Sequence, residues 1–167
     1  MSAVEPNRAD IIAFMAKASA ALETPLPAPK DVFNFGGTGN MRLSDKLLHF
    51  AIARIKTATT SWPIPDPLYW GVGDLSVILD GRGTPGAVMR TTSFVECKFK
   101  DVAEDFALAE AEGDYETYRQ GHAEFYRKQK DGDQFDEESM VLCERFEVIY
   151  PKYEKGEKDE NEGESVQ

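Results

Sequence analysis

The chain combines segments of helical apolar spacing with shorter segments of strand-like alternation. Apolar residues recur every three or four positions in two early segments, which predicts one helix over about 8–22 and a second over about 44–55. Asn7 and Ser44 are suitable side chains for capping the first turns of these helices. The first helix has an apolar face that we expect to pack on the core, made of Ile11, Met15, Ala18 and Leu22.

A β-hairpin is predicted in the middle of the chain. A short apolar run, Leu75–Leu79, is followed by the turn sequence Asp-Gly-Arg-Gly at 80–83 and by a β-like run over about 87–99. The pattern supports the pairing of these strands but leaves their register open. Residues 140–150 return to alternation with apolar positions on both faces, which predicts a closing strand that is partly buried on both sides.

Two further helices are predicted between the hairpin and the closing strand. Residues 102–111 have helical spacing, Gly113 breaks it, and Asp114 is positioned to cap a second helix that runs to about Lys128. One face of this second helix carries Tyr115, Tyr118, His122 and Phe125.

Length and charge limit the classes of ligand. The 167 residues are 41% apolar, which is ordinary for one globular domain, and the formal net charge is −11. The last 16 residues hold three lysines against six acidic residues, so most of the negative charge lies elsewhere. Such a surface repels long nucleic acid. We therefore expect either a local basic cleft for RNA or a ligand the size of a nucleoside.

The remaining composition points to a reducing compartment. No apolar run is long enough to cross a membrane, and the N-terminus lacks the pattern of a secretory signal, so we expect a cytoplasmic protein without membrane contact. Cys97 and Cys143 are interpreted as buried free thiols, with a disulfide as the alternative.

One lysine stands in a run of hydroxyl residues where the second helix ends. Residues 54–62 read Arg-Ile-Lys-Thr-Ala-Thr-Thr-Ser-Trp, and three prolines follow within five residues. A desolvated lysine can act as a base or bind an anion, and an adjacent threonine offers a hydroxyl that such a base could activate. The alternative is a solvated helix end followed by the start of a strand.

Aromatic, acidic and histidine side chains supply further candidates. The segment from Trp62 to Trp70 could stack a base or plug the end of a small barrel. Glu110 and Glu112 precede the break at Gly113 and could point into a cleft, or could be solvated charges. His122 is either a hydrogen-bonded core histidine or a catalyst. No cysteine–histidine spacing fits a zinc site, and no phosphate-binding glycine loop is present.

The hydroxyl run resembles the signature of the ASCH domain family of the PUA-like superfamily. The stretch 55–61, Ile-Lys-Thr-Ala-Thr-Thr-Ser, carries this resemblance. Other parts agree in the same order: Gly73-Asp74, the acidic turn at 106–114, Tyr118-Arg119 with His122 and Phe125-Tyr126, and the strand at 144–150. The resemblance extends from about Asp10 to Tyr150. It implies an α+β fold, a PUA-like small β-barrel surrounded by helices, with an RNA or nucleoside ligand in a cleft between barrel and helices.

The resemblance also divides the chain. Residues 1–30 would form an N-terminal helix and a proline-rich connector packed on the domain, 31–150 the ASCH domain, and 151–167 an acidic disordered tail.

Site roles follow from the resemblance. The family signature Gly-x-Lys-x-x-Glu-x-Arg keeps only its lysine here, because Arg54, Thr59 and Ser61 occupy the other positions. Threonine at the glutamate position is similar to a small bacterial branch that deacetylates N4-acetylcytidine. That likeness implies Lys56, Thr59 and Glu112 as catalytic residues, with Glu110 as the alternative carboxylate. The expected ligand-binding residues are Arg54, Thr57, Thr60, Ser61, Trp62, Trp70, Glu110, Arg119 and His122.

Three functions remain open from the sequence. The first is amide hydrolysis on a nucleoside of the N4-acetylcytidine type, without metal or cofactor. The second is cleavage of single-stranded RNA, with Lys56 holding a phosphate. The third is a non-catalytic RNA-binding module in which Arg54 and Lys56 hold a phosphate and a ring of the segment 62–70 stacks on a base. The partner is thus a nucleoside or single-stranded RNA, and the oligomeric state is open.

Overall fold

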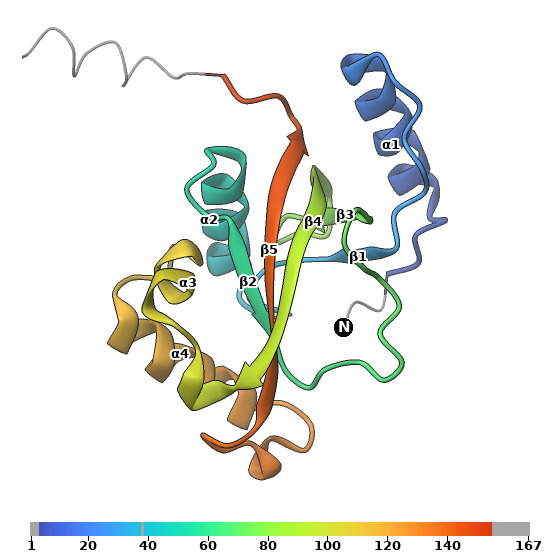
Figure 1. The fold of residues 1–167 in the computed structure, drawn as a ribbon. Coiled ribbons are helices and arrows are strands. Elements are labelled where there is room, and N and C mark those ends of the chain that lie inside the picture. The colour runs from blue at the N-terminus through green and yellow to red at the C-terminus, as the bar shows by residue number, and fades with distance from the viewer. Residues whose placement is uncertain (1–3, 38, 155–167) are drawn as a thin grey trace, which may run out of the picture.

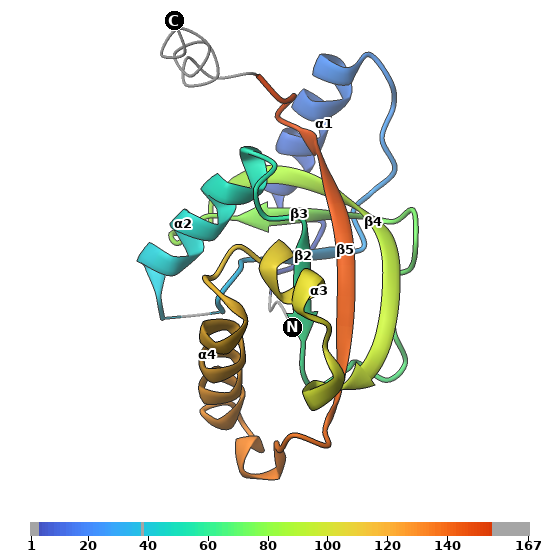
Figure 2. The ribbon, with the colours of Figure 1, turned by 60° about the vertical axis from the view of Figure 1, so that its left-hand side comes forward.

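A curled five-stranded sheet forms the centre of the molecule (Figures 1 and 2). The computed structural model describes residues 4–37 and 39–154. The spatial order of the strands is β1-β3-β4-β5-β2. Their bounds are β1 (Asp31–Phe33), β2 (Ala58–Ser61), β3 (Leu75–Leu79), β4 (Pro85–Lys98) and β5 (Met140–Tyr150). The pair β1–β3 is parallel and the other three pairs are antiparallel. The expected α+β fold of a small PUA-like barrel with helices around it is confirmed, with the sheet curled into a half-barrel.

Helices cover the sheet from several sides. They are α1 (Ala9–Leu22), α2 (Met41–Ile52), α3 (Glu104–Ala109) and α4 (Tyr115–Arg127), with short 3-10 turns η1 (Phe99–Asp101) and η2 (Gly132–Gln134). Figure 1 shows α1 on one side of the sheet, and α2, α3 and α4 on the other. The four predicted helices are therefore present. The third is shorter than expected, and Asp114 caps the fourth by accepting a hydrogen bond from the Thr117 amide at 2.8 Å.

The predicted caps of the first two helices are wrong. Asn40 caps α2 by accepting a hydrogen bond from the Leu43 amide, so α2 begins three residues before Ser44. Ser44 instead lies within the helix, where its side chain is buried and its hydroxyl donates to the Phe35 carbonyl at 2.7 Å. Helix α1 begins after Arg8 without a side-chain cap, so Asn7 does not have the predicted role.

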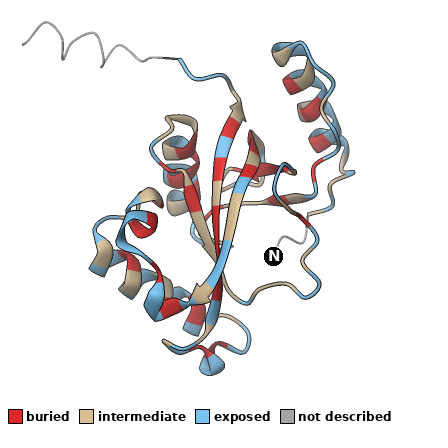
Figure 3. Ribbon diagram, viewed as in Figure 1, coloured by how far each residue is buried: buried red, intermediate tan, exposed pale blue. Residues whose placement is uncertain are grey.

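The core consists of three apolar clusters. Figure 3 shows the buried positions of the helices and strands in red. Helix α1 packs Ile11, Met15 and Ala18 on β1, β3 and β4, as its apolar face predicts, while Leu22 is only half-buried. Helix α2 packs on the inner face of β4 and β5. Helices α3 and α4 enclose a third cluster with the start of β5. Each fully buried large side chain contributes roughly 1.5–3 kcal/mol.

The strands confirm the predicted hairpin and closing strand. Strands β3 and β4 pair across the turn at 80–83, and β4 then pairs with β5 along most of its length with two irregularities of register. Successive residues of β5 face opposite sides. Phe146 and Val148 pack with α2, whereas Val141 and Cys143 pack with the α3–α4 cluster. The strand is thus buried on both faces, as its mixed pattern predicts.

Two other expectations concern the thiols and the tail. Cys97 and Cys143 are free, and their sulfur atoms lie 3.9 Å apart on adjacent strands. The predicted disordered tail lies outside the described residues from 155 onward. Among the residues that the structure describes, no helix is long and apolar enough to cross a bilayer.

Candidate functional site

Lys56 is buried between the end of α2 and the start of β2. Its side chain is 1% exposed, so the alternative of a solvated helix end does not hold. The ammonium donates to the Ala58 carbonyl at 2.8 Å, to the Glu110 carbonyl at 3.2 Å and to Glu110 Oε1 at 3.4 Å. It also lies 4.7 Å from the centroid of the Phe35 ring. All three N–H donors are used, which fixes β2 to the end of α3.

Glu110 is the buried partner of this lysine. It ends α3, and its carboxylate accepts the Thr60 hydroxyl at 2.5 Å and the Thr60 amide at 3.3 Å. Burial alone raises the pKa of this carboxyl, but the charges of His122 and Lys56 and hydrogen bonds from His122 and Thr60 hold it at about 2. Glu110 is therefore a fixed anion at the centre of the cluster.

A strained turn between α3 and α4 aims the two glutamates differently. Ala111 has a φ of 61° and Gly113 a φ of 98°, both in the left-handed region. At Gly113 a Cβ would also lie 3.0 Å from the Thr117 side chain, so this position favours glycine. The turn places Glu110 inside the protein and leaves Glu112 half-buried.

His122, on α4, joins the buried pair to Glu112. Its Nδ1 lies 2.9 Å from the Tyr118 carbonyl, which can only accept, so Nδ1 carries a proton. Its Nε2 lies 3.1–3.2 Å from both carboxylate oxygens of Glu110 and 3.4 Å from Glu112 Oε2. Burial lowers the pKa of His122, but the charges of Glu110 and Glu112 raise it overall. Burial raises the pKa of Glu112.

Access to solvent differs within the cluster. The side chains of His122 and Glu112 are 11% and 23% exposed, whereas those of Lys56 and Glu110 are 1% and 2% exposed. We call Lys56, Thr60, Glu110, Glu112 and His122 the charged cluster. A ligand therefore meets the imidazole and the Glu112 carboxylate first.

Two tyrosines fix the threonine of the cluster. The Thr60 hydroxyl donates to Glu110, so the Tyr118 hydroxyl, 2.8 Å away, donates to Thr60. Burial raises the pKa of Tyr118, which keeps this phenol a donor. The Tyr126 hydroxyl donates to the Thr60 carbonyl at 3.1 Å. These bonds hold β2 against α4.

The structure brings together only part of the predicted catalytic set. Thr59 pairs with Glu144 of β5 and lies on the face of β2 opposite to Thr60, because side chains of a strand alternate. Glu112 reaches the cluster through His122, while Glu110 is the carboxylate that contacts Lys56. The alternation Ala58–Thr59–Thr60 contained a signal for Thr60, since an apolar Ala58 marks the buried face.

Two predicted arginines are engaged elsewhere. Arg54 donates to the Ile52 and Pro151 carbonyls at 2.7 and 2.8 Å, and its guanidinium lies over the Tyr153 ring. Arg119 pairs with Glu137 at 2.7 Å. Neither belongs to the charged cluster.

The other predicted ligand-binding residues have structural contacts. Trp62 packs in the α3–α4 cluster against Phe135, and Trp70 is buried and packs on Phe94. The packing of both rings therefore favours the interpretation that this segment plugs the end of the barrel over the interpretation that it stacks on a base. The Thr57 amide donates to the Ala109 carbonyl of α3, the Thr57 carbonyl accepts from the Phe146 amide of β5, and Ser61 pairs with Leu142. These backbone contacts join β2 and the residue before it to their neighbours, and neither residue belongs to the charged cluster.

One part of the charged cluster has the composition of a metal site. Among the described residues, ligand atoms of Glu110, Glu112 and His122 all lie within 4.8 Å of one another. Carboxylate oxygens and an imidazole nitrogen are ligands of zinc and similar ions.

Comparisons with known proteins agree with this fold. Residues 31–150 match the ASCH domain family. A crystal structure of a protein of Enterococcus faecalis V583, described by the family DUF984, superposes with a TM-score of 0.71 at 26% identity, covering 88% of this chain and 98% of that one. An ASCH domain of Lactobacillus crispatus JV V101 superposes with a TM-score of 0.68 at 21% identity, covering 81% and 95%. A search among curated proteins gives no match.

The chain thus belongs to the ASCH domain family, because the match covers most of its length. This family is generally linked to RNA-related function.

Proposed function

We propose that this protein is a hydrolase that cleaves an amide on a small neutral nucleoside of the N4-acetylcytidine type. The observation that carries the proposal is the charged cluster, in which an imidazole and a carboxylate reach solvent while a buried ion pair holds them in place. An acid and a base within 3.4 Å of each other are the groups that amide hydrolysis requires. The N4-acetyl group is chosen from the resemblance of the hydroxyl run to the deacetylating branch.

Charge favours a neutral substrate over RNA. Lys56 lies behind Glu110 and uses its donors on protein acceptors, so it is not placed to hold a phosphate. Arg54 is engaged at Pro151, and the whole chain has a net charge of −11. Phosphate contacts would have to overcome this field. These points support the nucleoside over the ribonuclease and the RNA-binding module.

In the proposed reaction, Glu112 and His122 contact the reacting atoms. The Glu112 carboxylate takes a proton from water, and the water oxygen attacks the acetyl carbonyl carbon while the Nε2–H of His122 donates to the carbonyl oxygen. The tetrahedral intermediate collapses, the carbon–nitrogen bond breaks, and Glu112 returns the proton to the leaving amine. The products are cytidine and acetic acid, which releases its proton to solvent and becomes acetate. Lys56, Thr60 and Glu110 position the imidazole.

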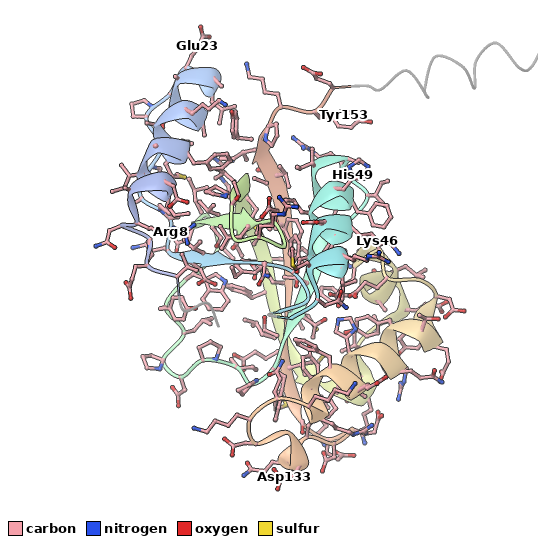
Figure 4. The ribbon with its side chains drawn as sticks, turned by 180° about the vertical axis from the view of Figure 1, so that it is seen from behind. Arg8, Glu23, Lys46, His49, Asp133 and Tyr153 are labelled. Carbon is pink, nitrogen blue, oxygen red and sulfur yellow. The ribbon has the colours of Figure 1, made fainter. Side chains whose placement is uncertain are left out.

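We predict that Glu112→Gln and His122→Asn each lower kcat on N4-acetylcytidine by about 10²-fold or more, because each removes a proton-transfer group. Chromatography measures the cytidine released, and circular dichroism confirms the fold. His49→Asn is the matched control, since His49 is an exposed histidine on α2 (Figure 4). Cytidine release by both variants at the wild-type rate would refute the proposed chemistry.

We also predict that turnover of N4-acetylcytidine changes little between 50 and 200 mM salt, because no phosphate contact and no counterion release is involved. The measurement is initial rate against salt concentration, with a single-stranded RNA tested in parallel. No cytidine release, together with RNA cleavage that falls steeply with salt, would favour the ribonuclease instead.

A further inference from the structure

His122 Nε2 lies between two carboxylates. The Nδ1 proton is committed to the Tyr118 carbonyl, and among the described residues Nε2 faces the carboxylates of Glu110 and Glu112. A metal ion bound between the three groups would take the place of a proton on Nε2.

We propose that Glu110, Glu112 and His122 form a binding site for a divalent transition-metal ion of the zinc class. Their ligand atoms lie within 4.8 Å of one another, so small rotations of the side chains bring them into the first coordination shell of one ion. One imidazole with carboxylates suits Zn²⁺, Mn²⁺ or Co²⁺ better than Ca²⁺ or Mg²⁺, which prefer oxygen alone.

The outer contacts are those that orient metal ligands. The Tyr118 carbonyl accepts from Nδ1 of His122 at 2.9 Å and so fixes the tautomer that leaves Nε2 for a metal. The Thr60 hydroxyl fixes Glu110. Glu112 is partly exposed, so an ion can reach the three groups from solvent.

The local charge permits such an ion but limits its affinity. With a neutral imidazole, the two carboxylates carry two negative charges and Lys56 carries one positive charge beside Glu110. A divalent ion therefore meets a net negative environment that is weaker than in a site without the lysine. Because of Lys56, we expect this site to bind zinc less tightly than a structural zinc site does.

A bound ion would have a consequence for turnover. It would occupy the nitrogen from which His122 donates in the proposed reaction, so zinc is expected to inhibit. This consequence rests on the proposed function, whereas metal binding does not.

Cobalt gives a direct test on the full chain after treatment with a chelator. We expect Co²⁺ to produce saturable visible absorption, and His122→Asn and Glu112→Gln each to weaken its binding at least about tenfold. His49→Asn keeps the wild-type spectrum. All variants keep the acidic residues outside the site, so weak binding of Co²⁺ to those residues contributes equally to the spectrum of each variant. Thermal unfolding with Zn²⁺ is a second measurement, and Tm should rise in the wild type and not in His122→Asn.

Each result decides the proposal. Cobalt spectra of equal strength in the wild type and in His122→Asn would place the ion elsewhere and overturn the site. Absence of both a spectrum and a Tm shift would overturn it as well. If N4-acetylcytidine is not hydrolysed but the spectrum is lost in His122→Asn, the metal site stands and the proposed function fails. If zinc binds but leaves turnover unchanged, the metal site stands and only the expected inhibition is refuted.

Discussion

Glu110→Gln is expected to lower the free energy of unfolding by about 3–5 kcal/mol, because it leaves a buried ammonium without its anion. Lys56 is 1% exposed, and its remaining acceptors are the carbonyls of Ala58 and residue 110. The substitution also removes the charge that stabilises the His122 imidazolium. Chemical denaturation followed by circular dichroism measures the loss.

A double variant separates the ion pair from simple packing damage. Replacing both charges, in Lys56→Met with Glu110→Gln, should restore much of the loss, because neither buried charge then lacks a partner. Glu138→Gln is the matched control. Glu138 pairs with Lys98 and Lys100 on the surface, where ion pairs contribute little. Losses that simply add in the double variant would show that Lys56 and Glu110 do not act as a pair.

Glu144→Gln is expected to stabilise the protein by about 3 kcal/mol at pH 8 and to have little effect near pH 4. Glu144 is buried in β5 and accepts the Thr91 hydroxyl at 2.6 Å. Burial raises its pKa from 4.5 to about 7, while hydrogen bonds from Thr91 and Trp70 oppose this rise. The folded state therefore holds the proton more tightly than the unfolded state. The resulting stability is complete below pH 4.5 and is lost as the pH rises through 7.

Denaturation curves at several pH values between 4 and 8 test this expectation. Glutamine resembles the protonated carboxyl and cannot ionise, so the stability of the variant should fall less than that of the wild type over this range. Glu147→Gln is the control, because Glu147 lies on the same strand but is exposed and pairs with Arg90. Parallel pH curves for the wild type and Glu144→Gln would contradict the assignment.

Local spacing predicted most elements of the fold but not their ends or their register. The two-sided pattern of 140–150 and the turn at 80–83 gave the closing strand and the hairpin, since both are local properties of the chain. The cap of α2 was misplaced because Ser44 is a good capping residue by type. Its hydroxyl instead donates to the backbone carbonyl of Phe35, nine residues earlier in the chain. Register was open because β4 mixes polar and apolar residues on both faces.

The sequence by itself determined that Lys56 stands in a hydroxyl run at a helix exit, that two glutamates precede a break, and that the chain resembles an ASCH domain. Only the tertiary structure decided which residues meet. Strand alternation turns Thr60 rather than Thr59 towards Glu110, and the left-handed turn at 111–113 buries Glu110 while leaving Glu112 partly exposed. The pKa values and the charge pairing of these groups depend on burial and on neighbours far apart in the chain, such as Lys56 and Glu110. Residue type alone therefore could not assign them.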